Sequence, residues 1–126
     1  MVLLCFGTRP EWLKIKPLVK LMDRSKYKLL FTGQHPDLLR DIEVDYTIRI
    51  RESDNRLDQL VSDCLLQFPT DSSLTSVLVQ GDTASAFACA VAAFNRKLQI
   101  YYLEAGLRSC NLDHPYPEEG YRQIIS

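Results

Sequence analysis

Short apolar runs recur along the chain, and each is followed within a few residues by polar or glycine-containing segments. The runs cover residues 2–6, 27–32, 46–50, 76–79 and 99–103. Runs of this length between turn residues are typical of β-strands, and the continuous ones are typical of strands buried on both faces. The pattern therefore predicts five strands.

Helical patterns fill the segments between these runs. Thr8-Arg9-Pro10-Glu11 is typical of a helix start, because threonine can cap, proline suits the first turn and glutamate favours the positive end of the helix dipole. An apolar stripe of Leu13, Leu18, Leu21 and Met22 would follow, and Pro17 is expected to kink this helix or to delay its regular start. Further helices are predicted at residues 35–42, 57–68 and 84–94, and from residue 117 onward.

Strand and helix alternate through all 126 residues, with no repeat, linker or low-complexity segment. Alternation of this kind is typical of parallel βαβ units whose helices cover both faces of one sheet. The sequence therefore predicts an α/β fold of one domain, a doubly wound parallel sheet of the Rossmann-like type.

Composition and net charge limit the kinds of binding partner that we expect for the chain. The net charge is -1, so overall electrostatics favour neither nucleic acid nor an anionic membrane. The chain shows no signal peptide and no apolar stretch long enough to cross a bilayer. Four cysteines (Cys5, Cys64, Cys89 and Cys110) lie far apart without metal-ligand spacing, which indicates a reduced, cytoplasmic protein with no metal.

Candidate catalytic and binding residues lie where the predicted strands end. The first, second, fourth and fifth strands run into Gly-Thr-Arg-Pro-Glu, Thr-Gly-Gln-His, Gln-Gly-Asp-Thr and Glu-Ala-Gly-Leu-Arg. Open α/β sheets bind their ligands outside the carboxyl ends of the strands. We therefore expect Arg9, Gln34, Asp82 and Glu104 to lie along one edge of the sheet.

The same segments carry a family resemblance over the whole chain. FGTRPEWLKIKPLVK, TGQHPDLL, VLVQGDTASAFACAVAAF and YYLEAGLRSCNLDHPYPEEGYRQ resemble, in order and spacing, segments of the non-hydrolysing UDP-N-acetylglucosamine 2-epimerases. The resemblance implies that residues 1–126 form the amino-terminal, Rossmann-like half of a GT-B fold, and that a carboxyl-terminal domain absent from this chain holds most of the UDP. It also implies a homodimer, and a UDP-amino sugar as substrate with no cofactor.

The implied reaction eliminates UDP to leave 2-acetamidoglucal and adds it back with carbon 2 inverted. By resemblance, Asp82, Glu104, Glu118, Lys14 and Arg122 are catalytic and Arg9 binds UDP. Gln34 and His35 match a region that the family uses for a second, activating UDP-sugar, although Pro36 and Asp37 here replace the usual Arg-Glu. The family's catalytic histidine would lie after residue 126.

The cationic residues also fit simpler interpretations. Arg9 at a helix amino terminus suits a diphosphate, or it is a surface arginine tied to the helix end. Lys14 lies one and a half turns further along and could reach the same anion, or it is solvated. Arg122 follows Glu118 at i+4, so it either orients a catalytic carboxylate or forms an intrahelical pair.

The carboxylates have structural alternatives as well. Three carboxyl groups on one cleft could have pKa values pushed apart, as acid and base roles at carbon 2 require. Asp82 is also well placed to cap the next helix, which would be its likelier single role without the resemblance. Glu119 fits only first-turn helix electrostatics. Trp12 is interpreted as core, and Tyr121 replaces an asparagine common in the family.

Other functions stay open from the sequence alone. A GT-B glycosyltransferase half or a hydrolysing epimerase would share the architecture, although GTRPE, EAGLR and PEE-R together are not expected in a glycosyltransferase. A non-catalytic, truncated fragment is the third alternative.

Overall fold

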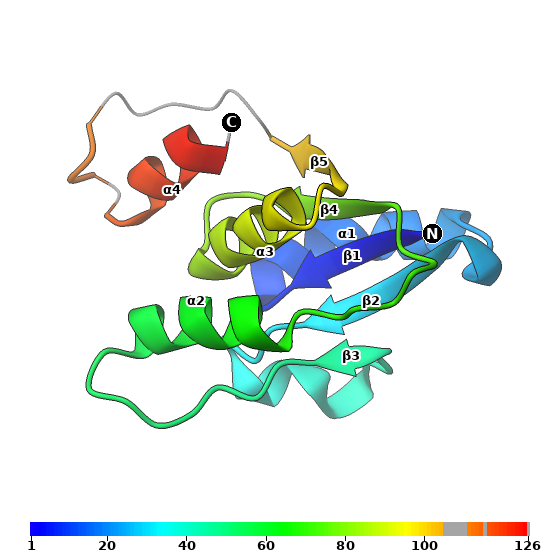
Figure 1. The fold of residues 1–126 in the computed structure, drawn as a ribbon, viewed down its shortest axis with the longest axis horizontal. Coiled ribbons are helices and arrows are strands. Elements are labelled where there is room, and N and C mark those ends of the chain that lie inside the picture. The colour runs from blue at the N-terminus through cyan, green and yellow to red at the C-terminus, as the bar shows by residue number, and fades with distance from the viewer. Residues whose placement is uncertain (105–110, 115, 126) are drawn as a thin grey trace.

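Five parallel strands form one sheet in the order β3-β2-β1-β4-β5 (Figure 1). The structure is a computed structural model, and it describes residues 1–104, 111–114 and 116–125. The strands are β1 (Val2–Phe6), β2 (Tyr27–Phe31), β3 (Tyr46–Thr47), β4 (Ser76–Gln80) and β5 (Gln99–Leu103).

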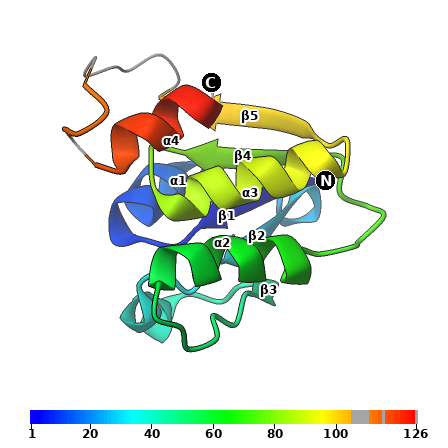
Figure 2. The same cartoon turned by 60° about the vertical axis from the view of Figure 1, so that its left-hand side comes forward.

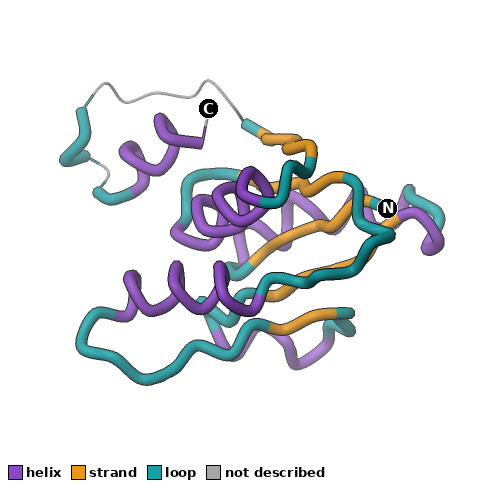
Figure 3. The backbone as a smooth tube through the Cα atoms, in the orientation of Figure 1, coloured by secondary structure: helices purple, strands orange, loops and turns teal. Residues whose placement is uncertain are grey.

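Helices cover both faces of the sheet and alternate with the strands along the backbone (Figure 3). Figure 2 shows α2 and α3 side by side on one face and α1 on the other. The helices are α1 (Arg9–Leu21), α2 (Arg56–Gln67), α3 (Ala84–Asn95) and α4 (Glu118–Ile125), with 3₁₀ turns η1 (Arg24–Lys26) and η2 (Pro36–Asp41). The predicted doubly wound, Rossmann-like fold is confirmed.

The central strand β1 divides the core between the two layers. Leu3 and Cys5 face the cluster under α2 and α3, whereas Leu4 and Phe6 face the cluster under α1. All four are at most 2% exposed. Successive side chains of a strand point to opposite faces, so a continuous apolar run is what a strand buried on both sides requires.

The third strand is shorter than the predicted residues 46–50. Only Tyr46 and Thr47 form β3, and the Ile48 N–H extends the pairing to the Phe31 carbonyl at 2.9 Å. The Gln67 side chain then accepts a hydrogen bond from the Arg49 N–H at 2.7 Å and donates one to the Arg49 carbonyl at 2.8 Å. A long-range side-chain contact therefore replaces the ladder that the local pattern predicts. The segment predicted as a helix at residues 35–42 is the 3₁₀ turn η2.

Half of the predicted stripe on α1 is wrong, because Leu18 and Met22 are partly buried whereas the other two positions face solvent. Leu13 and Leu21 are 54% and 85% exposed, and the helix buries Glu11 and Ile15 instead. The helix begins at Arg9, so Pro17 lies inside it and does not delay its start. Leu13 and Leu21 do not point to the sheet because packing against the sheet fixes which face of the helix turns inward.

The cysteines that the structure describes are all buried. Cys5, Cys64 and Cys89 are buried and free, and Cys110 lies outside the described residues. Within the described ranges, none of the helices is both long and apolar enough to cross a membrane.

Candidate active site

A cleft of about 370 Å³ opens at the carboxyl edge of the sheet. It lies where β1, β2, β4 and β5 end, beside the first turns of α1 and α4. We call this hollow the cleft; it is lined by Thr8, Pro10, Glu11, Lys14, Gln34, His35, Gln80, Gly81, Asp82, Thr83, Glu104 and Glu118.

Most of the residues singled out in the sequence meet here. Lys14, Gln34, His35, Asp82, Glu104 and Glu118 all line the cleft. Arg122 does not line the cleft, but its guanidinium group pairs with the carboxylate of Asp82. Arg9 is exposed and lines a separate hollow between α1 and η2, together with Trp12 and Lys16.

Asp82 is held by a cation from a distant part of the chain. Arg122 Nη2 on α4 donates to Asp82 Oδ2, and this hydrogen bond raises the pKa of the arginine. Asp82 is not the helix cap that the sequence favoured, because the Thr83 hydroxyl accepts the Ala86 N–H at 3.1 Å and caps α3 itself. The carboxylate of Asp82 therefore pairs with Arg122 and lines the cleft.

Glu104 has a partner on the opposite side of the cleft. Lys14 Nζ donates to Glu104 Oε1 at 2.5 Å, so β5 is linked to α1 across the ends of β1 and β4. Glu104 has a φ of 66°, in the left-handed region that non-glycine residues rarely adopt. A residue held in this conformation directly after a strand is a recognised mark of a functional site.

The two neighbouring glutamates of α4 have different surroundings. Glu118 lines the cleft. Glu119 is fully buried and accepts hydrogen bonds from Arg122 Nη1 at 3.2 Å and from Gln123 Nε2 at 3.0 Å. The sequence interpretation of Glu119 as a first-turn charge missed this role, because its burial depends on how α4 packs in the fold.

Glu11 is the second carboxylate that the sequence analysis undervalued. Its Oε1 accepts hydrogen bonds from the Gly7 N–H at 3.1 Å, the Thr8 N–H at 3.0 Å and the Thr8 hydroxyl at 2.8 Å. Burial raises the pKa of Glu11 to about 7, although the hydrogen bonds from Thr8 and Gly7 lower it. The Thr8-x-x-Glu11 spacing of a capping box was the available signal.

Glu11 occupies backbone N–H groups at the start of α1, where the sequence analysis expected a diphosphate to bind. The N–H groups of Gly7 and Thr8 already donate to a carboxyl group within the chain. Gly7 has no room for a side chain, because a Cβ there would lie 2.0 Å from Thr32 Oγ1 and 2.2 Å from Ser85 Oγ. The turn is therefore packed tightly against the start of α3.

Gln34 is anchored from two directions. Its Oε1 accepts the Ser85 N–H at 3.2 Å and the Ser85 hydroxyl at 2.5 Å, which joins the β2 loop to the start of α3. Arg56 Nη2 donates to the Gly33 and Gln34 carbonyls, both at 3.1 Å. Arg56 is a positioning residue that the sequence analysis missed.

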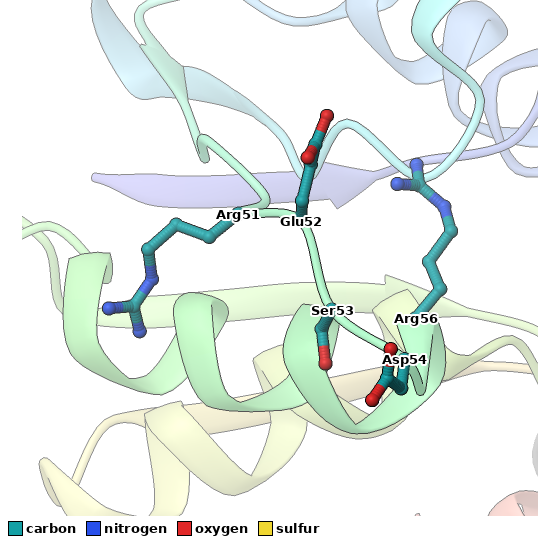
Figure 4. Close-up of a pocket in the computed structure, with 5 residues that line it drawn as sticks. All are labelled: Arg51, Glu52, Ser53, Asp54 and Arg56. Atoms are coloured by element: carbon teal, nitrogen blue, oxygen red, sulfur yellow. The ribbon is translucent and has the colours of Figure 1, made fainter.

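Figure 4 shows the neighbouring hollow lined by residues 51–54 and Arg56, with the two arginine side chains pointing away from each other. Arg51 pairs with buried Asp63, and Arg56 bonds to the β2 loop. Both cations therefore have structural partners. In the part of the chain that the structure describes, no cluster of three His, Cys, Asp or Glu side chains could hold a metal.

Comparison with known proteins decides the family. The sequence profile described as UDP-N-acetylglucosamine 2-epimerase matches residues 20–126. The chain belongs to the UDP-N-acetylglucosamine 2-epimerase family. It is 39% identical to the UDP-N-acetylglucosamine 2-epimerase of Campylobacter jejuni, over 98% of this chain and 36% of that protein. It is 37% identical to that of Salmonella borreze, over 99% of this chain and 36% of that protein.

A solved structure of this epimerase family has the same fold. The crystal structure of UDP-GlcNAc 2-epimerase from Neisseria meningitidis bound to UDP-GlcNAc has a TM-score of 0.87 and 33% identity, over 98% of this chain and 37% of that one. The predicted family and the predicted fold class, the amino-terminal half of a GT-B fold, are confirmed. The chain spans little more than a third of the length of the relatives it matches.

Proposed function

We propose that this chain supplies one wall of the active site of a non-hydrolysing epimerase that interconverts UDP-N-acetylglucosamine and UDP-N-acetylmannosamine. The observation that carries the proposal is the cleft, where Lys14, Asp82, Glu104 and Glu118 meet from four separate segments of the chain. Family membership supplies the class of reaction.

Elimination followed by re-addition explains why the cleft needs several carboxyl groups. A base removes the proton from carbon 2, the bond from carbon 1 to the UDP oxygen breaks with its electron pair, and a double bond forms in 2-acetamidoglucal. An acid then returns a proton to the other face of carbon 2 as the UDP oxygen bonds to carbon 1. We assign these proton transfers to Asp82, Glu104 and Glu118, which line the cleft together.

The cations of the cleft fit supporting roles. Arg122 orients Asp82, and Lys14 orients Glu104 while remaining more than half exposed. A lysine at that position can also stabilise negative charge that develops as UDP leaves. We propose that Arg9, at the start of α1, binds UDP. We propose that Gln34 and His35 bind the second, activating UDP-sugar.

A second wall is part of the proposal. The cleft is open, whereas small-molecule sites bury most of their ligand. We propose that a carboxyl-terminal domain holds most of the UDP, that residues 1–126 alone are inactive, and that the complete enzyme is a homodimer. The buried, free cysteines Cys5, Cys64 and Cys89 support a cytoplasmic location.

Exchange of solvent deuterium into carbon 2 tests this function. The complete enzyme, incubated with UDP-N-acetylglucosamine in deuterium oxide, should form UDP-N-acetylmannosamine that carries deuterium at carbon 2. Release of free sugar in place of a UDP-sugar would indicate a hydrolysing epimerase, and transfer to an acceptor would indicate a glycosyltransferase. Turnover by residues 1–126 alone would contradict the need for a second wall.

A further inference from the structure

Glu11 lies in the cleft but has no part in the proton transfers assigned above. The residue is 1% exposed, and its two carboxyl oxygens have different surroundings. Oε1 accepts the three hydrogen bonds from Gly7 and Thr8, whereas Oε2 is buried and forms no hydrogen bond with any described residue.

This arrangement can hold Glu11 in either protonation state. The donors of Gly7 and Thr8 stay on Oε1 whether or not a proton is present, so the turn keeps its shape. Oε2 is the oxygen that can carry the proton. Because burial raises the pKa of Glu11 to about 7, both states are populated near neutral pH.

The charges around Glu11 determine how it responds to a ligand. The cleft holds titratable groups from every neighbouring element, namely Lys14, His35, Asp82, Glu104 and Glu118. Hydrogen bonds among the buried thiols and their burial raise the pKa of Cys64 on α2 and of Cys89 on α3, and the charge of Glu11 adds a smaller contribution. Lys14 is bonded to Glu104, so no described contact gives Glu11 a cation of its own.

A diphosphate entering the cleft adds negative charge close to this buried carboxyl group. A like charge nearby disfavours the ionised form of an acid, and the low polarity of a buried site strengthens this repulsion between the two charges. We propose that Glu11 takes up a proton when the diphosphate of a sugar nucleotide occupies the cleft. Ligand binding is then coupled to pH, and the neutral Glu11 removes a repulsion without releasing the Gly7–Thr8 turn. The proposal rests on the proposed function, because that function makes a UDP-sugar the ligand.

Calorimetric titration of the complete enzyme with UDP-N-acetylglucosamine tests the coupling. Titrations in buffers of different ionisation enthalpy should show proton uptake on binding between about pH 7 and 8, falling toward zero in acid, where Glu11 is already protonated. The Kd should weaken as pH rises, by at most about tenfold per pH unit for one proton. The diphosphate of a UDP-sugar does not titrate in this range.

Glu11→Gln is the decisive variant. A glutamine keeps an oxygen for the Gly7 and Thr8 donors and imitates the neutral acid, so its affinity should not depend on pH and should match wild type in acid. Glu43→Gln, the same change at an exposed glutamate outside the cleft, is the matched control. It should keep the proton uptake of wild type.

The outcomes separate this proposal from the function on which it rests. Binding without proton uptake, or equal uptake by Glu11→Gln, would overturn the role of Glu11 and leave the epimerase function intact. Failure of UDP-N-acetylglucosamine to bind at any pH would overturn both. If Glu11→Gln does not fold, carbon-13 NMR of the Glu11 carboxyl group in wild type provides the test. Its titration midpoint should rise when the ligand is added, and an unchanged midpoint would overturn the proposal.

Discussion

Glu11 on the cleft and Asp63 on α2 are buried to the same degree, 1% and 0% exposed, but their surroundings are opposite. Asp63 accepts hydrogen bonds from the Arg51 N–H at 2.8 Å, the Arg51 guanidinium at 2.9 Å and the Gln59 amide at 3.0 Å. Burial raises the pKa of Asp63, but these partners outweigh it and lower the pKa overall. Glu11 has local hydrogen bonds without a cation, and its pKa is raised to about 7.

The difference teaches that burial alone does not set the charge of a carboxyl group. Desolvation disfavours the charged form in both places, and a cation that also donates hydrogen bonds reverses the result. In the cleft, Asp82 and Glu104 have a cation as Asp63 does, and they differ from Glu11 in this respect. The comparison therefore separates carboxyl groups that are paired with a cation from a buried carboxyl group that has none.

The largest expected effect is on turnover. Asp82→Asn, Glu104→Gln or Glu118→Gln should each lower kcat by about 10² to 10⁴, the usual worth of a general acid or base, with a much smaller effect on KM. Steady-state kinetics and the rate of deuterium exchange at carbon 2 measure this. Glu43→Gln, an exposed carboxylate outside the cleft, should change neither. Normal exchange in all three cleft variants would refute the assignment.

Removing the cation of Asp63 should come next in size. Arg51→Leu leaves a buried carboxylate without its charged partner and should reduce the free energy of unfolding by about 3 kcal/mol at pH 7. Urea unfolding measures the loss. A second change, Asp63→Asn in the same chain, should recover part of it, because no buried charge is then left unpaired. An unchanged stability of Arg51→Leu would show that the comparison with Glu11 is mistaken.

Glu11 should make the protein less stable as pH rises. Its pKa is raised from 4.5 to about 7, so its stabilising proton is fully present below pH 4.5 and is lost as pH rises through 7. Between pH 5 and 8 the free energy of unfolding should fall by about 2–3 kcal/mol on this account. Unfolding curves of wild type and Glu11→Gln at both pH values measure it, and equal pH dependence in the two proteins would contradict it.

Lys14 should show the smallest effect on stability. The pair of Lys14 with Glu104 is partly exposed, at 59% and 32% of the two side chains, and pairs of this kind contribute about 0.2–1 kcal/mol. Lys14→Met should therefore unfold almost as wild type does while losing activity. A loss of stability as large as that of Arg51→Leu would mean that the pair is structural.

Local sequence accounted for most of the fold. The bounds of β1 and β5 were predicted to the residue, and α2, α3 and β4 to within one residue. Those segments combine a clear apolar pattern with residues that mark each end, such as Gly7 after β1 and Thr83 before α3. The prediction failed at β3, where Gln67 bonds to Arg49 from 18 residues further along the chain, and in part of the buried stripe of α1, which packing on the sheet decides.

The sequence by itself also determined most of the residues that meet, although Arg9, expected beside them, lines a separate hollow. Strands that are parallel and consecutive in βαβ units must end at one edge, so Asp82 and Glu104 were bound to approach Lys14 and Gln34. Only the tertiary structure decided the partner of each charge. Arg122 reaches Asp82 across forty residues, and Glu11 is buried without a cation, because packing of α4 and α1 sets desolvation and distance. Those quantities depend on neighbours that no local pattern contains.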